Sequence, residues 1–242
     1  TEITTEVKGS TNGIQQRIDN MFSAIVSEKC PAVTIGEQCN SPYECPLKEE
    51  CWDFLPENNI FEMYGSKKKA FELFEKDIYT FKDIPDDFLL NGKQKIQKDC
   101  EISGKPHIEK KAIKQFLNTL QYPLYYLDFE TFNTAIPLFD GTRPYQQIPF
   151  QFSLHVVEKE NAIAKHYSFL ADGNDDPRHE FIASLKKVLG NSGSIVVYSQ
   201  GFEKGVLSRL ATFLPKHNKW VESLNDRIID LLAPFRSFHY YD

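Results

Sequence analysis

The sequence lacks the motifs of several common enzyme mechanisms. It contains no GxxxxGK[ST], GxSxG or HExxH pattern, so P-loop, hydrolase-elbow and zincin chemistry have no support. No window approaches the roughly 18 uninterrupted apolar residues that a membrane span needs, and we expect no membrane partner. No basic segment followed by an apolar core is visible as a signal peptide, and we expect a cytoplasmic protein.

An overall excess of positive charge is also missing. The 242 residues carry a formal charge of −6, which excludes a uniformly basic nucleic-acid coat but allows an enzyme that reaches phosphates through a metal. Residues 91–114 depart from this balance, with seven lysines against three acidic residues, a local excess of +4. These lysines form either the solvated face of a helix or a salt-sensitive contact with nucleic acid.

Apolar spacing predicts the order of helices and strands. The expected helices cover residues 13–29, 66–78, 107–120, 177–190, 206–213 and 220–232, and the expected strands cover 124–132, 150–157, 162–170 and 194–199. After residue 123 the order is three strands, a helix, a strand and two helices, with the three strands forming an antiparallel meander. This order is typical of ribonuclease H-like folds, an α/β architecture with a mixed sheet and flanking helices.

Two acidic residues stand two positions apart on the first predicted strand. Asp128 and Glu130 therefore leave the same face, and their neighbours Leu127 and Phe129 indicate a central strand. Two carboxylates on a buried strand repel each other and lose hydration, so a cation between them would stabilise them. Mg²⁺ or Mn²⁺, completed by water and a substrate phosphate, fits this pair. Alternatively, the strand ends here and both acids are solvated at a loop mouth.

Two further acidic residues follow later elements. Glu203 stands at the start of a helix after the strand 194–199, and it reaches the same sheet edge if that strand runs parallel to the first. Alternatively, Glu203 is a first-turn charge that favours the helix dipole. Asp230, in Arg-Ile-Ile-Asp-Leu-Leu, is a ligand, a residue that orients a ligand, or an acid on the exposed face of a helix.

Cysteines are concentrated in one loop-forming segment. Five residues separate Cys39 from Cys45 and Cys45 from Cys51, and eight residues separate Cys30 from Cys39. In a reducing cytoplasm this arrangement favours metal ligation over disulfides, with free thiols as the other interpretation. Cys100 lies far from the segment, and we expect a structural role for it.

The run YPLYYLDFETFNTAIPLFDGTRPYQQIPFQFSLHV, residues 122–156, closely resembles an uncharacterised bacterial domain family that follows RecB-like nuclease domains. That family in turn resembles the DnaQ-like exonucleases, which use four acidic residues and two metal ions. Asp128 and Glu130 match the Asp-x-Glu of the first motif. Phe202-Glu203 stands where the superfamily usually has Phe-Asp, and Asp230 resembles the Asp that follows the second motif. The last motif, an Asp preceded by His or Tyr, is not recognisable before residue 242.

The resemblance implies metal-dependent phosphodiester hydrolysis of the 3′–5′ exonuclease type in bacterial DNA processing. Asp128 would bridge two ions, Glu130 would bind one ion and orient the attacking water, and Glu203 would complete the coordination. Asp230 is a further candidate catalytic residue, although its counterpart in the superfamily is often not a direct ligand. The expected partner is nucleic acid, DNA by preference. Among the aromatic residues near the site, Phe132 and Tyr145 are the candidates to stack terminal bases.

The cysteine segment resembles the C-terminal cysteine cluster of RecB-like nucleases that hold an iron–sulfur cluster. Residues 1–56 would then be the tail of such a nuclease region, 57–121 a helical linker region, and 122–242 a ribonuclease H-like domain truncated at its C-terminus. The resemblance implies a RecB-like nuclease domain in the same full-length chain as a partner. It also implies a 4Fe–4S cluster or Zn²⁺ held by cysteines, namely Cys30, Cys39, Cys45 and Cys51.

Two rival hypotheses stay open. A catalytically inactive ribonuclease H-like module would bind nucleic acid or a partner for the nuclease upstream. The missing last Asp and the Glu at position 203 favour this rival. The third hypothesis is a metal-stapled structural adaptor with no substrate.

Overall fold

Two compact units make up the chain. Our computed structural model describes residues 3–28, 33–65 and 67–242. Unit 1 comprises Thr1–Glu62 and Ser66–Thr80, and unit 2 comprises Met63–Gly65 and Phe81–Asp242. Within the described ranges, no helix has the length and apolar character needed to cross a membrane.

Unit 1 consists of short helices joined by loops. Its elements are α1 (Thr4–Ser10), α2 (Ile14–Ile25), η1 (Glu37–Cys39), α3 (Lys48–Trp52), η2 (Ile60–Glu62) and α4 (Lys67–Phe74). Aromatic rings supply much of its packing, with the ring of Phe61 centred 4.6 Å from that of Trp52 and 4.9 Å from that of Phe71. Leu73 of α4 is fully buried. Edge-on ring contacts of this kind add to the stabilisation from apolar burial.

The predicted helices at 13–29 and 66–78 are confirmed as α2 and α4 in shorter form. Ser66, the expected N-cap, lies outside the described residues. No residue of α2 is buried, although its apolar spacing suggests a covered face. Helical spacing specifies the helix itself, whereas burial needs a second surface against it.

Three helical elements and one short strand precede the main sheet of unit 2. They are η3 (Phe81–Asp83), α5 (Gly92–Ser103), the strand β1 (His107–Ile108) and α6 (Lys110–Leu117). The predicted helix at 107–120 therefore starts later than expected. His107 and Ile108 pair instead with Tyr241 and Tyr240 of β7 (Tyr240–Tyr241), and this long-range pairing leaves no local signal.

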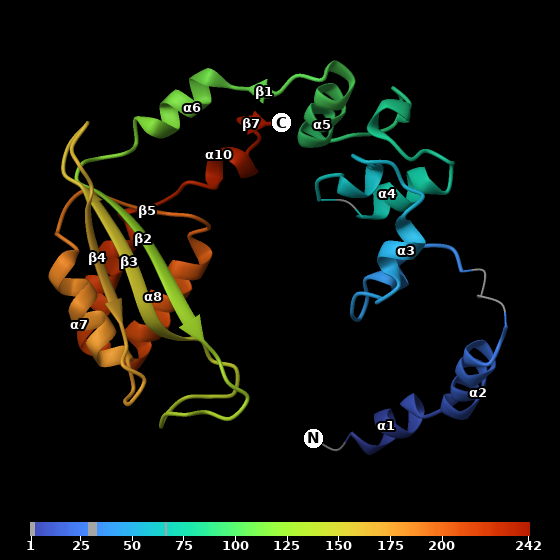
Figure 1. The fold of residues 1–242 in the computed structure, drawn as a ribbon, viewed down its shortest axis with the longest axis horizontal. Coiled ribbons are helices and arrows are strands. Elements are labelled where there is room, and N and C mark those ends of the chain that lie inside the picture. The colour runs from blue at the N-terminus through green and yellow to red at the C-terminus, as the bar shows by residue number, and fades with distance from the viewer. Residues whose placement is uncertain (1–2, 29–32, 66) are drawn as a thin grey trace. The chain divides into compact units, whose positions relative to one another are not determined.

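A five-stranded mixed sheet forms the centre of unit 2 (Figure 1). Its strands are β2 (Leu124–Phe132), β3 (Ile148–Val157), β4 (Lys165–Leu170), β5 (Ser194–Val197) and β6 (Ile228–Asp230), in the spatial order β4-β3-β2-β5-β6. The first three strands are antiparallel, and β5 and β6 lie parallel to β2 on its other side. The predicted α/β class, meander and central first strand are confirmed.

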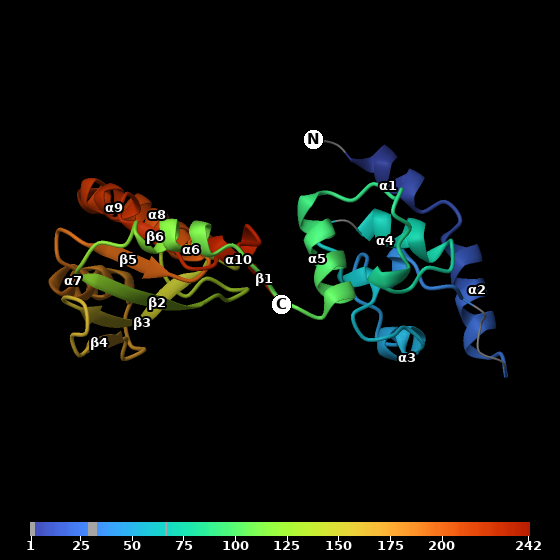
Figure 2. The ribbon, with the colours of Figure 1, turned by 90° about the horizontal axis from the view of Figure 1, so that it is seen from above.

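One face of the sheet packs against helices, and the other is open along β2 but covered at β5, whose four residues are all buried. Leu127 and Phe129 of β2 point into a core shared with Phe181 of α7 (Arg178–Val188) and Leu207 of α8 (Gly201–Phe213), and all four are buried. Helix α9 (Asn218–Asn225) packs against α8 (Figure 2). On the opposite face of β2, Leu124 at the start of the strand is buried, but Tyr126, Asp128 and Glu130 are exposed, so the middle of this strand presents a largely polar face to solvent.

The predicted helix at 220–232 is wrong in its second half. α9 ends at Asn225, and β6 follows, with Ile228 opposite Ile195 and Asp230 opposite Val197 of β5. A short helix, α10 (Ala233–Arg236), comes next. Over so few residues, the apolar pair Ile228 and Ile229 is compatible with a helix and with a strand. Its pairing with β5 makes this segment a strand.

Candidate functional site

Three acidic side chains come from neighbouring parallel strands of the sheet. Asp128 lies on β2, Asp230 ends β6, and Glu203 is the third residue of α8, the helix that follows β5. Parallel strands end at the same sheet edge, where open α/β sheets form their sites. The expectation that Glu203 follows a strand parallel to the first is therefore confirmed. We call Asp128, Glu203 and Asp230 the carboxylate site.

Glu203 is the buried member of the carboxylate site. Its side chain is 2% exposed, and its Oε2 atom has no hydrogen-bond partner among the described residues. Burial raises the pKa of Glu203 most strongly, its own backbone N–H opposes this, and the negative charges of Asp128 and Asp230 raise it further. The three carboxylates thus share one electrostatic environment, and a buried acceptor atom is left unpaired in it.

Asp128 and Glu130 lie together on the open face of the sheet. Both are exposed, and their cross-strand neighbours on β3 are the polar residues Ser153 and Gln151. The prediction that both side chains leave the same face of the strand is confirmed. The expected loss of hydration is wrong, because the face that helices cover carries Leu127 and Phe129, and the two acids point to the exposed face. The strand also continues beyond the pair to Phe132.

Asp230 has both carboxylate oxygens engaged. Its Oδ1 accepts hydrogen bonds from the backbone N–H of Ser199 at 2.8 Å and of Leu232 at 2.9 Å. Its Oδ2 lies 3.6 Å from Nη1 of Arg236, whose Nη2 donates to Oγ of Ser199 at 3.0 Å. Ser199 has a φ of 68°, so Asp230 holds a left-handed turn that leads into α8. The helix-surface interpretation of Asp230 is wrong, and the orienting interpretation fits its contacts.

The carboxylate site offers the type of ligand that a hard divalent cation prefers, but few such ligands. Carboxylate oxygens suit Mg²⁺ and Mn²⁺, and the unpaired Oε2 of Glu203 is an acceptor without a donor. However, no group of three or more His, Cys, Asp or Glu side chains in the described ranges is arranged to hold a metal. Such a cation would therefore take few ligands from this chain and the rest from water and phosphate.

The cysteine segment gathers no preformed metal site among the described residues. Cys39 is buried in η1, Cys45 is half-buried, and Cys51 is exposed on α3. Cys30, the expected fourth ligand, lies outside the described residues. That the cysteines hold an iron–sulfur cluster or Zn²⁺ stays a prediction. Cys100 is buried, and burial raises the pKa of its thiol.

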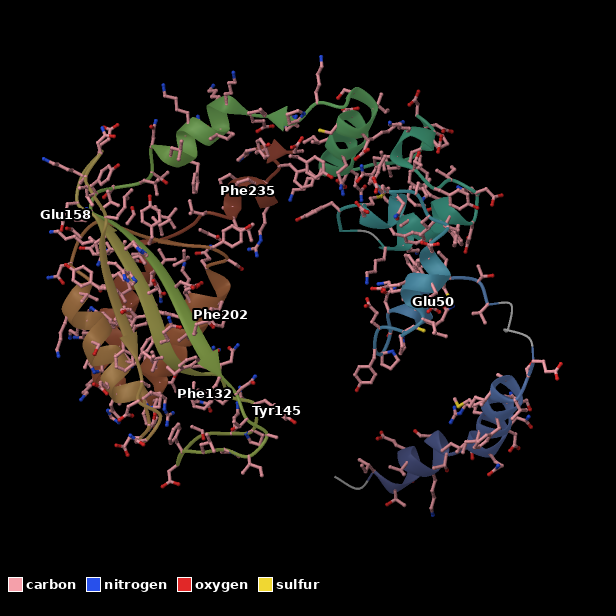
Figure 3. The ribbon with its side chains drawn as sticks, viewed as in Figure 1. Glu50, Phe132, Tyr145, Glu158, Phe202 and Phe235 are labelled. Atoms are coloured by element: carbon pink, nitrogen blue, oxygen red, sulfur yellow. The ribbon has the colours of Figure 1, made fainter. Side chains whose placement is uncertain are left out.

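The aromatic residues near β2 divide into core and surface. Phe129 belongs to the core, with its ring centred 5.2 Å from that of Phe181. Phe132 lies at the end of β2 and Tyr145 in the loop that follows (Figure 3), and Tyr145 is 69% exposed. Both candidates for base stacking are thus accessible at the same end of the strand.

Sequence reasoning missed three arginines that line one pocket. Arg143 comes from the loop between β2 and β3, Arg178 begins α7, and Arg209 lies on α8. At least thirty residues separate each from the next in the chain. No local motif signals such a group, because only the folded sheet and its helices bring it together.

The region that holds the carboxylate site matches a known family model. Residues 125–242 match the domain of unknown function DUF2779. All three carboxylates and all three arginines lie inside the matched residues. The match identifies a domain but assigns no activity to it.

Curated relatives of this chain are also uncharacterised. One is "Uncharacterized protein MG366" of Mycoplasma genitalium, 28% identical over 131 residues that span 50% of this chain and 20% of the relative. Another is "Uncharacterized protein MG366 homolog" of Mycoplasma pneumoniae, 30% identical over 119 residues that span 46% of this chain and 18% of the relative. The chain thus covers about a fifth of the length of these relatives. No solved structure matches it.

Proposed function

We propose that the sheet domain of unit 2 is a ribonuclease H-like, divalent-metal-dependent nuclease domain that hydrolyses phosphodiester bonds. The observation that carries the proposal is the buried, unpaired Oε2 of Glu203 in the field of Asp128 and Asp230. A buried carboxylate with raised pKa beside two other acids is destabilised as an anion, and a cation would relieve that strain.

The strand order supports the ribonuclease H-like part of the proposal. A central first strand with an antiparallel meander on one side and two parallel strands on the other places the carboxyl ends of β2, β5 and β6 at one edge. The three acids of the carboxylate site come from these three positions. The resemblance of Asp128-Phe-Glu130 to the first DnaQ-like motif points to the same fold.

The residues of the chain have distinct roles in this proposal. A divalent ion, when bound, would supply hydroxide near neutral pH and stabilise the leaving oxygen. Glu203 and Asp128 would hold the cation, and Glu130, exposed beside Asp128, would orient the attacking water. Asp230 fixes the Ser199 turn and thereby positions Glu203 at the start of α8. A RecB-like nuclease domain in the full-length protein and DNA as substrate remain part of the proposal through the sequence resemblance.

The direct test is calorimetric titration of this chain with Mn²⁺ beside an Asp128→Asn/Glu130→Gln double variant. We expect Mn²⁺ binding by the parent and a loss of at least about tenfold in affinity in the double variant. The matched control is Glu158→Gln/Glu160→Gln, which removes two exposed acids at the other end of β3 (Figure 3). Equal Mn²⁺ binding by all three proteins would contradict a metal site on β2.

An inactive binding module is the second candidate. The absence of a three-residue metal group in the described part of the chain favours it. The module predicts no Mn²⁺ binding and no cleavage, with retained binding of an oligonucleotide. Cleavage of a labelled oligonucleotide by the parent chain with Mn²⁺, abolished by Asp128→Asn, would exclude it.

A further inference from the structure

A strongly cationic pocket lies at the loop between β2 and β3. Its volume is about 400 Å³, and its walls are formed by Gly141, Arg143, Gln146, Arg178, Arg209, Thr212 and Phe213. Three of these residues are arginines and none is acidic. We call it the arginine pocket.

The guanidinium groups of the arginine pocket are incompletely paired. Arg178 is 2% exposed and stacks on Phe213 with 3.3 Å between its guanidinium carbon and the ring centroid. Asp176 compensates the charge of Arg178 through two contacts, with Nε donating to Oδ1 at 2.9 Å and Nη2 to Oδ2 at 2.5 Å. The third nitrogen, Nη1, is buried with no partner among the described residues. A buried donor without an acceptor is costly, and an anion in the pocket would supply one.

Arg209 and Arg143 have no carboxylate partner within the described residues. Nη2 of Arg209 donates to the neutral side chain of Gln147 at 2.7 Å, and its Nε is buried and unpaired. Burial lowers the pKa of Arg209, and the positive charge of Arg143 lowers it further. Two like charges held together without a counter-ion indicate a place for an anion.

An apolar pocket shares the same loop and the same end of α7. It has a volume of about 290 Å³ and is lined by Phe132, Leu138, Phe139, Phe150, Ala171, Gly173, Asp175 and Pro177. Phe132 makes tilted or edge-on contacts with Phe139 and Phe150, at 6.3 Å and 6.1 Å between ring centroids. Flat apolar ligands such as nucleobases stack on surfaces of this kind. We call it the aromatic pocket.

The two pockets adjoin along the chain at two places. The loop supplies Phe139 to the aromatic pocket and Arg143 to the arginine pocket, and the entry to α7 supplies Pro177 to one and Arg178 to the other. A ligand that spans them therefore joins a flat apolar group to an anion. Arginine's planar fork matches phosphate oxygens, which makes phosphate the fitting anion.

We propose that the aromatic and arginine pockets together bind one nucleotide of a nucleic-acid strand, the base in the first pocket and its phosphate in the second. That this nucleotide belongs to a nucleic-acid strand rests on the proposed nuclease function. The binding itself needs neither metal nor the carboxylate site.

The test measures binding of deoxythymidine 5′-monophosphate (dTMP), thymidine and inorganic phosphate to the 242-residue chain by calorimetry in EDTA and a phosphate-free buffer. We expect dTMP to bind about tenfold or more tightly than either fragment. Arg143→Ala and Arg209→Gln should each weaken dTMP binding about tenfold or more. Phe139→Ala should weaken dTMP and thymidine binding but leave phosphate binding unchanged.

Matched controls separate this inference from general charge and from the proposed function. Lys187→Ala removes one positive charge at the other end of α7 and should bind dTMP like the parent. Asp128→Asn/Glu130→Gln should also bind dTMP like the parent, so failure of the metal site leaves this test intact. Unchanged dTMP binding in both arginine variants would overturn the phosphate site. Equal affinities for dTMP and inorganic phosphate would overturn the base site.

Discussion

Replacing Glu203 with glutamine is expected to stabilise unit 2 and to abolish Mn²⁺-dependent cleavage at the same time. The ionised carboxylate is buried beside Asp128 and Asp230, so the neutral amide removes a charge that the fold does not stabilise. We expect the free energy of unfolding at pH 7 to rise by about 1 kcal/mol. Cleavage should fall at least about 100-fold, because a cation ligand is lost.

The stability gain should depend on pH in a defined direction. The pKa of Glu203 is raised in the folded chain, so the folded state binds this proton more tightly than the unfolded state. The parent therefore loses stability as pH rises from the ordinary glutamate pKa through the raised value. Below the ordinary pKa the carboxyl is neutral in both states, and the advantage of Glu203→Gln should disappear there. Urea unfolding of both proteins across this pH range measures the effect.

Glu180→Gln on α7 is a matched control. Glu180 is also the third residue of its helix, and it is exposed, so its charge interacts with the helix dipole without burial. The control should lose a few tenths of a kcal/mol at pH 7 and should keep cleavage. A similar small loss in Glu203→Gln would show that Glu203 is a first-turn charge. Added Mn²⁺ should stabilise the parent and the control but not Glu203→Gln.

The strands of the sheet were accessible to sequence reasoning because their signals are local. The run from Leu124 to Phe132 is rich in aromatic residues, and within it apolar Leu127 and Phe129 alternate with acidic Asp128 and Glu130. The strand has the same bounds as this run. The placement of Glu203 followed from one topological assumption, that the strand before it is parallel to the first. A short buried apolar run after a helix is typical of such a strand, and the pairing of β5 with β2 confirms it.

Features that depend on pairing across long separations were missed. Apolar spacing predicts a helix where the strand ending at Asp230 lies, because no turn signal stands near Ile228 and Ile229. The residues that pair with them lie on β5, far away in the sequence. Asp230 gains its role from Ser199, 31 residues earlier, and from Arg236. The sequence likewise leaves open whether Asp128 and Glu130 are buried or solvated, since the alternation along a strand does not say which of its faces helices cover.

Arg227 provides the second large effect, because it joins β5 and β6 at their entry. Its guanidinium donates to the backbone carbonyls of Gly190, Ser192 and Gly193, at 2.6, 2.6 and 2.8 Å. Its own carbonyl accepts from the N–H of Ile195 at 2.9 Å. The side chain of Arg227, the residue before β6, thus holds the turn that precedes β5 by three hydrogen bonds.

Arg227→Met should therefore lower the free energy of unfolding of unit 2 by about 2–4 kcal/mol. Methionine keeps much of the apolar stem but leaves three backbone carbonyls without their charged donor. Arg227 is half-buried, and burial lowers the pKa of its guanidinium. The control is Lys219→Met on α9, an exposed residue, whose change should stay within about 0.5 kcal/mol. Urea unfolding followed by circular dichroism compares the two. A loss in Arg227→Met no larger than in the control would mean that backbone pairing alone sets β5 beside β6, and with it the approach of Glu203 to Asp230.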